Sequence, residues 1–226
     1  NTDPTILDGG IMPAIKGNTR VGHSGTMITE ACEYTNSFLS FAPTVGIILN
    51  VAADHLVFFK DLDDIRHSFR RYAELLPANG ALIINGDIDN LEYFTKDLDC
   101  KVITVGSEES GSMYTAKNIT FDEFAHGSYD LYVEGEFKHR VTLKVTGMHN
   151  IYNSLAAIAT AHFLNIDKED ILNGLEAYGG TDRRFQFKGK LGDITVIDDY
   201  AHHPDEITAT LKTAEHYPHK KLWVVF

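Results

Sequence analysis

Short apolar runs alternate with helical segments through the first half of the chain. Residues 45–49, 81–85 and 101–105 are apolar runs rich in β-branched side chains, which is typical of strands buried in a parallel sheet. Residues 61–76 carry apolar side chains at helical spacing, and residues 87–98 are predicted as a second helix. Because strands and helices alternate, we predict an α/β fold with a doubly wound, mostly parallel sheet.

The hydrophobic pattern changes after Gly106. Three segments alternate polar and apolar residues and are separated by glycine-containing turns, which predicts an antiparallel meander added to the parallel sheet. They are residues 114–121, 129–133 and 137–145. Two helices are predicted next, at 150–163 and at 167–178, with Asp167 as the N-cap of the second. Before the first buried strand we expect short strands at 5–7 and 26–29, joined by a glycine-rich loop over 8–25.

A second α/β unit is predicted at the end of the chain. Strand 194–197, helix 205–216 and strand 221–226 would form the first βαβ unit of a Rossmann-like domain, and Pro204 suits the first turn of that helix. We therefore divide the chain into a domain over 1–186 and the start of another over 187–226. The chain begins without Met and ends inside an apolar run, so we expect a fragment of a longer polypeptide.

Composition narrows the classes of function. The 226 residues include 43% hydrophobic ones, enough for a sizeable core, and carry a formal net charge of -12. An acidic chain lacks the basic face that nucleic acids and anionic membranes require, and no apolar run is long enough to span a bilayer. Two cysteines without a CxxC pattern predict neither a disulfide framework nor a thiolate zinc site, so a cytoplasmic location is expected. No GxxxxGK[ST] loop is present to cradle phosphates.

Acidic and imidazole side chains follow two of the predicted strands. Glu33 comes after the strand at 26–29, and Asp54 and His55 come after the strand at 45–49. Ligands of open α/β sheets bind at the carboxyl ends of the strands, so these three side chains could hold Mg²⁺ against a phosphorylated substrate. In the alternative interpretation, Asp54 caps a turn and His55 is a surface histidine.

Three further clusters carry candidate chemistry. Asn150 and Asn153 lie three positions apart at a helix start, where they could contact a purine edge or a phosphate, unless Asn150 is only the N-cap. Arg183 and Arg184 suit phosphate oxygens, although a solvated pair is the alternative. Residues 198–204, DDYAHHP, form a dense polar loop after a strand. Its adjacent histidines should point in different directions, so they are not expected to share one zinc.

The ordered set of these motifs resembles the Mur ligase family over most of the chain. The matching segments are DPTILDGG (3–10), GNTRVG (17–22), TEACEY (29–34), SFLSF (37–41), NVAADH (50–55), FFKDLDDIRHSF (58–69), GMHNIYNSLAAIA (147–159), GTDRRFQFKG (180–189) and IDDYAHHPDEI (197–207). HNxxN together with RRFxFKG and DDYxHHP resembles the alanine-adding branch. The helix at 61–76 contains no lysine, whereas several other branches carry a carbamylated lysine there.

The resemblance implies an ATP-dependent amide ligase of peptidoglycan synthesis. Such an enzyme uses ATP and Mg²⁺ to convert the lactyl carboxylate of UDP-N-acetylmuramate to an acyl phosphate, which L-alanine then attacks. The family's phosphate-binding loop lies upstream of the segment that matches DPTIL, so we expect this chain alone to be inactive. Alternatives are another Mur-type ligase, such as the murein tripeptide ligase, or a non-catalytic nucleotide- or sugar-binding module.

The resemblance also implies roles for individual residues. Its pattern at the third strand is closer to N-[IV]-E-x-D-H-x-D, so Ala52 and Val57 stand where acids are usual. Those missing acids could weaken a second shell around Mg²⁺, or they could be structural. The implied roles are Mg²⁺ ligation by Glu33 and His55, catalysis by His55, Arg184 and His202, nucleotide binding by Asn150, Asn153, Arg183, Arg184, Asp199 and Tyr200, and contact with the other substrates by Gly9, Gly10, Asn18 and His203.

Overall fold

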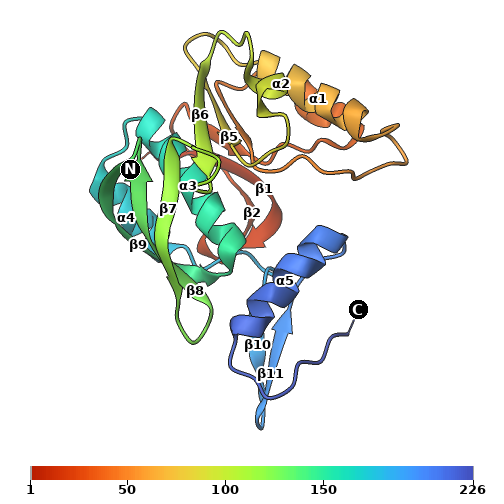
Figure 1. Ribbon diagram of the computed structural model, residues 1–226, viewed down its shortest axis with the longest axis vertical. Coiled ribbons are helices and arrows are strands. Elements are labelled where there is room, and N and C mark those ends of the chain that lie inside the picture. The colour runs from red at the N-terminus through yellow and green to blue at the C-terminus, as the bar shows by residue number, and fades with distance from the viewer. Residues whose placement is uncertain (1, 226) are drawn as a thin grey trace.

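A six-stranded sheet forms the centre of the molecule. The computed structural model describes residues 2–225, without the side chain of Asp205. The strand order is β4-β5-β6-β7-β8-β9, in which β4 to β7 run parallel and β8 and β9 join antiparallel. This arrangement confirms the predicted parallel sheet with its added meander (Figure 1). The bounds are β4 Val45–Ile48, β5 Ala81–Asn85, β6 Lys101–Gly106, β7 Tyr114–Phe121, β8 His126–Val133 and β9 Glu136–Thr146.

Helices cover both faces of this sheet. Successive residues of β5 point to opposite faces, and each face is fully buried. Ala81 and Ile83 belong to the core that includes α3, whereas Leu82 and Ile84 belong to the core that includes α1. The sheet is therefore doubly wound, as predicted. The helices are α1 Leu62–Glu74 and α2 Leu91–Thr95 on one side, and α3 Met148–Phe163 and α4 Lys168–Ala177 on the other.

The helix α2 is shorter than the segment 87–98 expected from the sequence. The side-chain oxygen of Asn85 accepts a hydrogen bond from the backbone N–H of Asp87 at 3.0 Å, which folds the chain into a turn after β5. The Asp87 carboxylate in turn accepts the backbone N–H of Ser107 at 2.8 Å, just past the end of β6. Polar contacts that tie two strand ends together thus delay the start of the helix.

A separate three-stranded sheet precedes the main one, in the order β2-β1-β3. The loop expected over residues 8–25 is wrong in part, because β1 (Thr5–Met12) extends into it and β2 (Gly17–Arg20) lies within it. These two strands pair antiparallel, and β1 pairs parallel with β3 (Met27–Thr29). The glycines within β1 have low strand propensity, so pairing with neighbours, rather than local preference, forms this strand.

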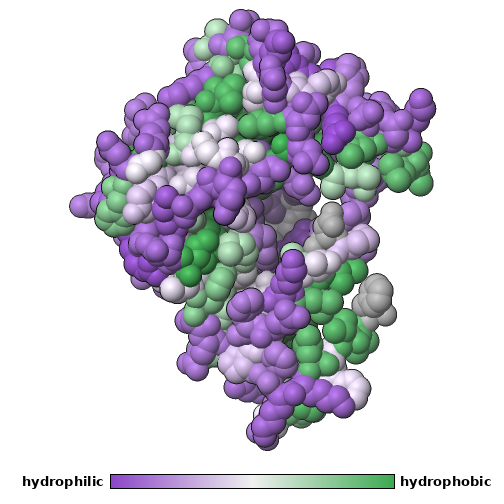
Figure 2. Space-filling model, in the orientation of Figure 1, coloured by the Kyte–Doolittle hydropathy of each residue, from purple (hydrophilic) through white to green (hydrophobic). Residues whose placement is uncertain are grey.

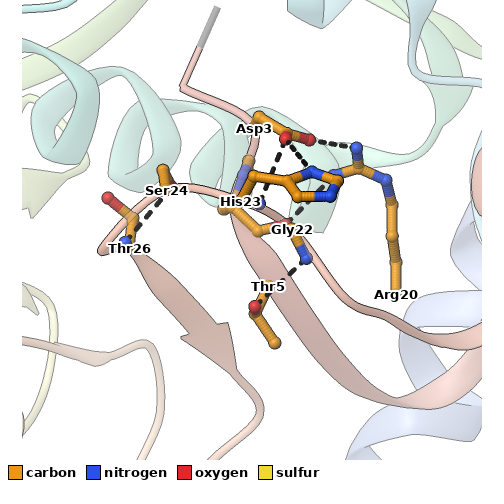
Figure 3. Close-up of polar contacts among 8 residues, drawn as sticks. Asp3, Thr5, Arg20, Gly22, His23, Ser24 and Thr26 are labelled. Carbon is orange, nitrogen blue, oxygen red and sulfur yellow. Dashed lines mark hydrogen bonds and ion pairs between the residues drawn. The ribbon is translucent and has the colours of Figure 1, made fainter.

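The Asp3 carboxylate joins the start of this small sheet to the loop after β2 (Figure 3). It pairs with the Arg20 guanidinium, and it also accepts hydrogen bonds from His23, whose backbone nitrogen lies 3.1 Å away and whose Nδ1 lies 2.9 Å away. Nearby, the Thr5 hydroxyl accepts the backbone N–H of Gly22 at 3.2 Å. The Arg20 guanidinium and then the His23 contacts lower the pKa of Asp3 below its ordinary value of 3.8.

Acid should therefore remove the stabilising effect of Asp3. A carboxyl group whose pKa is lowered by folding stabilises the protein above its unfolded pKa, and this contribution disappears as the pH falls through the folded pKa. We expect Asp3→Asn to lower the urea midpoint, measured by circular dichroism, by a constant amount above about pH 5 and by less toward about pH 2. Asp89→Asn, at an exposed position, is the matched control. An Asp3→Asn deficit that stays unchanged down to the lowest pH would contradict this account.

The C-terminal segments form a smaller lobe, drawn in blue below the main sheet in Figure 1. An antiparallel hairpin of β10 (Gln186–Leu191) and β11 (Ile194–Asp198) leads into α5 (Pro204–His216). The sequence did not predict β10. The predicted strand at 221–226 is wrong over residues 221–225, which form no regular structure, and Phe226 lies outside the described residues. Trp223 is 76% exposed there, with Lys221 Nζ 4.4 Å from its ring centre.

Apolar side chains gather on the surface of this lobe (Figure 2). On the hairpin, 47% or more of each of four apolar residues is exposed, at Phe187, Leu191, Ile194 and Val196.

Both cysteines of the described chain are free thiols, with Cys32 exposed and Cys100 buried. None of the helices in the described residues combines the length and the apolar character needed to cross a bilayer.

Candidate metal and nucleotide site

The fold brings Glu33, Asp54 and His55 together. One ligand atom from each of the three side chains lies within 4.8 Å of the others. His55 Nε2 is 3.3 Å from Glu33 Oε1, and His55 Nδ1 is 3.8 Å from Asp54 Oδ1. Glu33 follows β3 of the small sheet and the other two residues follow β4 of the main sheet, so the expected grouping is present but it joins the strand ends of two different sheets.

Two features hold Glu33 in place. Glu33 immediately precedes the 3₁₀ segment η2 (Tyr34–Ser40), whose Phe38 is only 2% exposed and stacks on Tyr72 of α1 at 4.9 Å between ring centres. The Phe38 backbone N–H donates to the Cys32 carbonyl at 2.9 Å. The Tyr34 ring packs against the His55 ring at 4.8 Å. The loop that carries Glu33 is thus anchored in the core through an aromatic side chain five positions away.

His55 has a left-handed backbone conformation, with φ of 51°. Its backbone N–H donates to Asp54 Oδ1 at 2.5 Å, and its carbonyl accepts the N–H of Phe58 at 2.8 Å. Asp54 therefore does cap a turn, as in the alternative interpretation, while also lying beside the imidazole. A non-glycine residue in this conformation is sustained only when its surroundings impose it, and such residues cluster at functional sites.

The three side chains suit a hard divalent cation. Two ligands at about 2.1 Å from Mg²⁺ and at right angles lie about 3 Å apart, close to the separation of His55 Nε2 and Glu33 Oε1. Magnesium in proteins is usually held by one or two carboxylates, several waters and substrate phosphates. The two carboxylates fit that description, and the imidazole adds a nitrogen ligand that is more typical of transition metals. The donor set would be a poor zinc site of the thiolate kind, since neither cysteine belongs to it.

A cavity of about 200 Å³ lies beside this cluster. It is lined both by residues of the main domain and by two residues of the C-terminal lobe, which makes it a site between the two parts of the chain. Ala52 lines the cavity, whereas Val57 is 91% exposed, so only the first of the two missing acids would face this site. The lining residues are Glu33, Asn50, Ala52, Asp54, Phe59, Ile65, Phe69, His203 and Glu206.

The start of α5 closes the cavity from the C-terminal lobe. His203 Nε2 lies 3.2 Å from the carbonyl oxygen of Ala53, in the loop after β4. The Glu206 carboxylate accepts the backbone N–H groups of His202 and His203 at 3.2 and 3.4 Å. Sequence reasoning missed Glu206. The sequence feature that could have revealed it is its position as the third residue of α5, after His203. A glutamate at that position can accept hydrogen bonds from the backbone at the start of its own helix.

The two arginines point to different partners. Arg183 lies 3.7 Å from the Asp198 carboxylate, and its guanidinium sits 4.6 Å from the centre of the Tyr200 ring. Arg184 instead reaches Glu206, with its NH1 3.7 Å from Oε1. Only Arg184 is therefore directed toward the cavity lining. The adjacent histidines also diverge, as predicted, because His202 Nδ1 lies 3.0 Å from the carbonyl oxygen of Tyr200.

The amino end of α3 lies beside α5, where a methyl group added at Gly147 would lie 2.5 Å from Thr213 Oγ1. The alternative that Asn150 is only the N-cap is wrong, because Gly147 takes that position with φ of 87° and ψ of 157°, a conformation that few residues other than glycine adopt. The Asn150 amide donates to the Thr146 carbonyl at 2.8 Å, and the Asn153 amide donates to Asn150 Oδ1 at 3.3 Å. The two asparagines thus share one face of the helix.

Electrostatic contacts link α3 to the loop after β11. Burial lowers the pKa of His149, the Asp199 carboxylate raises it and the Arg184 guanidinium lowers it further. Both Asp199 and Arg184 are therefore close to this imidazole. Asp199 also accepts the backbone N–H groups of Phe185 and Ala201 at 2.7 and 2.8 Å, so its carboxylate organises the loop. Its free lone pairs remain available to a ligand hydroxyl.

Three of the four residues expected to contact the other substrates, Gly9, Gly10 and Asn18, lie on the small sheet. The Gly9 N–H donates to Glu30 Oε2 at 2.5 Å. A methyl group added at Gly10 would meet the Thr181 side chain at 2.5 Å, so the absence of a side chain there lets the 178–182 segment approach β1. Asn18 is exposed on β2 and does not line the cavity. The structure groups these three apart from the cluster around Glu33.

Comparison with known proteins identifies the family. Residues 18–161, more than half of the chain, match the sequence profile of the Mur ligase middle domain. The chain belongs to the Mur ligase family. Residues 183–226 match a second Mur ligase profile, the glutamate ligase domain. The resemblance drawn from the ordered motifs is thereby confirmed.

Individual Mur ligases are similar over the whole chain. It is 59% identical over 224 residues to the UDP-N-acetylmuramate–L-alanine ligase of Lachnospira eligens, covering 99% of the chain and 49% of that protein. The ligase of the same name from Agathobacter rectalis is 53% identical over 225 residues, covering 100% and 49%. The crystal structure of UDP-N-acetylmuramate–alanine ligase from Thermotoga maritima superposes with a TM-score of 0.81 at 31% identity, covering 95% of the chain and 48% of that structure. The chain thus spans about half the length of the relatives it matches.

Proposed function

We propose that the polypeptide carrying this chain is an ATP-dependent ligase that joins L-alanine to UDP-N-acetylmuramate through an acyl phosphate. The 59% identity to a relative of that name, over nearly all of the chain, carries this proposal. The cavity supports it, because two carboxylates, an imidazole and a nearby arginine gather where two segments of the chain meet. In this proposal ATP is a substrate, and the polypeptide is located in the cytoplasm.

The proposed chemistry suits the residues present. A carboxylate is a poor electrophile until one of its oxygens becomes part of a phosphate leaving group. Transfer of that phosphate requires two anionic substrates to be held together. Mg²⁺ bound by Glu33 and His55 would neutralise charge on the nucleotide phosphates. Arg184 would contact phosphate oxygens at the same cavity, and the paired amides of Asn150 and Asn153 would contact the nucleotide. His202 and His203 would line the seam where the two lobes meet.

The domain division at residues 186 and 187 belongs to the same proposal. It is supported to within four residues by β10, which begins at Gln186, and by the second family profile, which begins at residue 183. On this division the cavity lies between a nucleotide-binding domain and the start of an amino-acid-binding domain. Substrates held by different domains would meet there.

Amino-acid-dependent release of ADP tests the function. The natural polypeptide that contains this chain is incubated with Mg-ATP and UDP-N-acetylmuramate, and ADP is followed with L-alanine, with glycine or with murein tripeptide. We expect release with L-alanine above that with the other two. Release with tripeptide and none with L-alanine would favour the murein tripeptide ligase, while none with any acceptor would favour a non-catalytic binding module.

Calorimetry on this chain alone tests whether residues 1–226 are sufficient to bind Mg-ATP. Residues 1–226 contain no GxxxxGK[ST] loop, so nothing in them provides the backbone cradle that such loops give to nucleotide phosphates. We expect no micromolar binding of Mg-ATP. Micromolar binding would show that the cavity between the lobes binds the nucleotide without such a loop.

A further inference from the structure

Glu206 makes contacts in three directions from the first turn of α5. Its Oε2 accepts the backbone N–H groups of His202 and His203, and its Oε1 lies 3.7 Å from Arg184 NH1. Its side chain also lines the cavity that contains Glu33 and Asp54. One carboxylate thus joins the backbone at the start of α5, a guanidinium and the wall of the candidate site.

The charge of Glu206 is maintained in the folded protein. Burial raises the pKa of this carboxyl group, but the amides of His202 and His203 and the charge of Arg184 outweigh it, so the net pKa is lowered. The group is therefore an anion at neutral pH. An ionised oxygen facing Arg184 restricts where that guanidinium can lie, and Arg184 is the arginine directed toward the cavity, whereas Arg183 contacts Asp198 and Tyr200.

We propose that Glu206 is a positioning residue that holds the Arg184 guanidinium at the edge of the cavity, ready for an anionic substrate. This inference rests on the proposed function, since it assigns the anion to the nucleotide phosphates. Long side chains lose rotamer freedom when they bind, and a partner that restricts the side chain beforehand reduces that cost. The competing account is that Glu206 only caps α5, as a glutamate does at this helical position.

Glu206→Gln separates the two accounts. Glutamine also serves at this capping position, so the substitution keeps the cap and removes the charge that faces Arg184. In the natural polypeptide we expect an unchanged thermal midpoint and a rise of about tenfold in the KM or Kd for Mg-ATP. Glu215→Gln, an exposed glutamate on the same helix, is the matched control and should leave both quantities unchanged.

A double-mutant cycle with Arg184→Ala identifies the route of the effect. If Glu206 acts through Arg184, Glu206→Gln should change Mg-ATP affinity by less than about twofold when Arg184 is already absent. An equal effect in both backgrounds, no effect in the wild type or tighter binding would each overturn the proposal.

Measuring the Kd by calorimetry, beside the KM, keeps this test distinct from that of the proposed function. A polypeptide that binds Mg-ATP but releases no ADP with L-alanine would refute the function and still decide the role of Glu206. A polypeptide that binds no Mg-ATP would refute both.

Discussion

Replacing His55 by alanine is expected to lower the kcat of the natural polypeptide at least about 100-fold. The imidazole lies 3.3 Å from Glu33 and supplies one of the three grouped ligand atoms, so its loss removes one of the three side-chain donors. Stabilisation of developing phosphate charge by a bound cation contributes several kcal/mol, of which the transition state would lose a large part. ADP release at saturating Mg²⁺ measures the effect.

The Mg²⁺ dependence shows whether the loss acts through the cation. We expect Glu33→Gln to raise the Mg²⁺ concentration needed for half-maximal activity by at least about tenfold, because a neutral amide binds a hard cation less well than a carboxylate. His67→Ala, at an exposed position on α1, is the control for loss of a histidine. If His55→Ala retained activity within about threefold of the wild type, the assignment of a metal site to this cluster would be wrong.

Replacing Phe38 by alanine is expected to destabilise this chain by about 3–5 kcal/mol. Phe38 is 2% exposed and contacts Tyr72 face to face and Phe69 edge to face, with centroid distances of 4.9 and 5.4 Å. Removing the ring leaves a cavity between η2 and α1 and removes two aromatic contacts. Urea unfolding followed by far-ultraviolet circular dichroism measures the change.

Two controls accompany this substitution. Phe187→Ala removes the same ring from a position that is 55% exposed on β10, and should cost less than about 1 kcal/mol. Phe38→Leu fills part of the space and should recover a large part of the stability. Equal losses at Phe38 and Phe187 would contradict the assignment of Phe38 to the core. Because Phe38 also anchors the loop of Glu33, Phe38→Ala should raise the Mg²⁺ concentration that the natural polypeptide needs for half-maximal activity.

The elements that could be predicted from sequence are those whose signal is local. The strand at Ala81–Asn85 and the helix that begins after Asp61 follow from a buried run and from a capping side chain, which accepts the Asp64 N–H at 3.0 Å. The part of β1 beyond Leu7 and the whole of β10 contain glycine and polar residues, so their identity as strands depends on pairing with partner strands. A strand at 221–226 was expected from its apolar residues alone, yet residues 221–225 pair with no strand of the described chain.

The residues of the candidate site also differ in how far the sequence could predict their positions. Glu33, Asp54 and His55 could each be placed in advance after the carboxyl end of a strand, but the sequence did not show that β3 and β4 belong to different sheets. The partners of Arg183 and Arg184 could not be predicted, since Asp198, Tyr200 and Glu206 lie farther along the chain. The sequence could have predicted Glu206 as a capping glutamate. Its position beside Arg184 could not be predicted, because it depends on tertiary packing.

The exposed Trp223 determines how folding of this chain can be observed. It is the only tryptophan among 226 residues, and a ring that is 76% exposed in the folded state already emits as it would in an unfolded chain. Unfolding of the central sheet should therefore be nearly silent in tryptophan fluorescence. Three of the ten tyrosines, Tyr72, Tyr114 and Tyr129, are buried around that sheet, so tyrosine emission reports on the core while tryptophan emission reports on the tail.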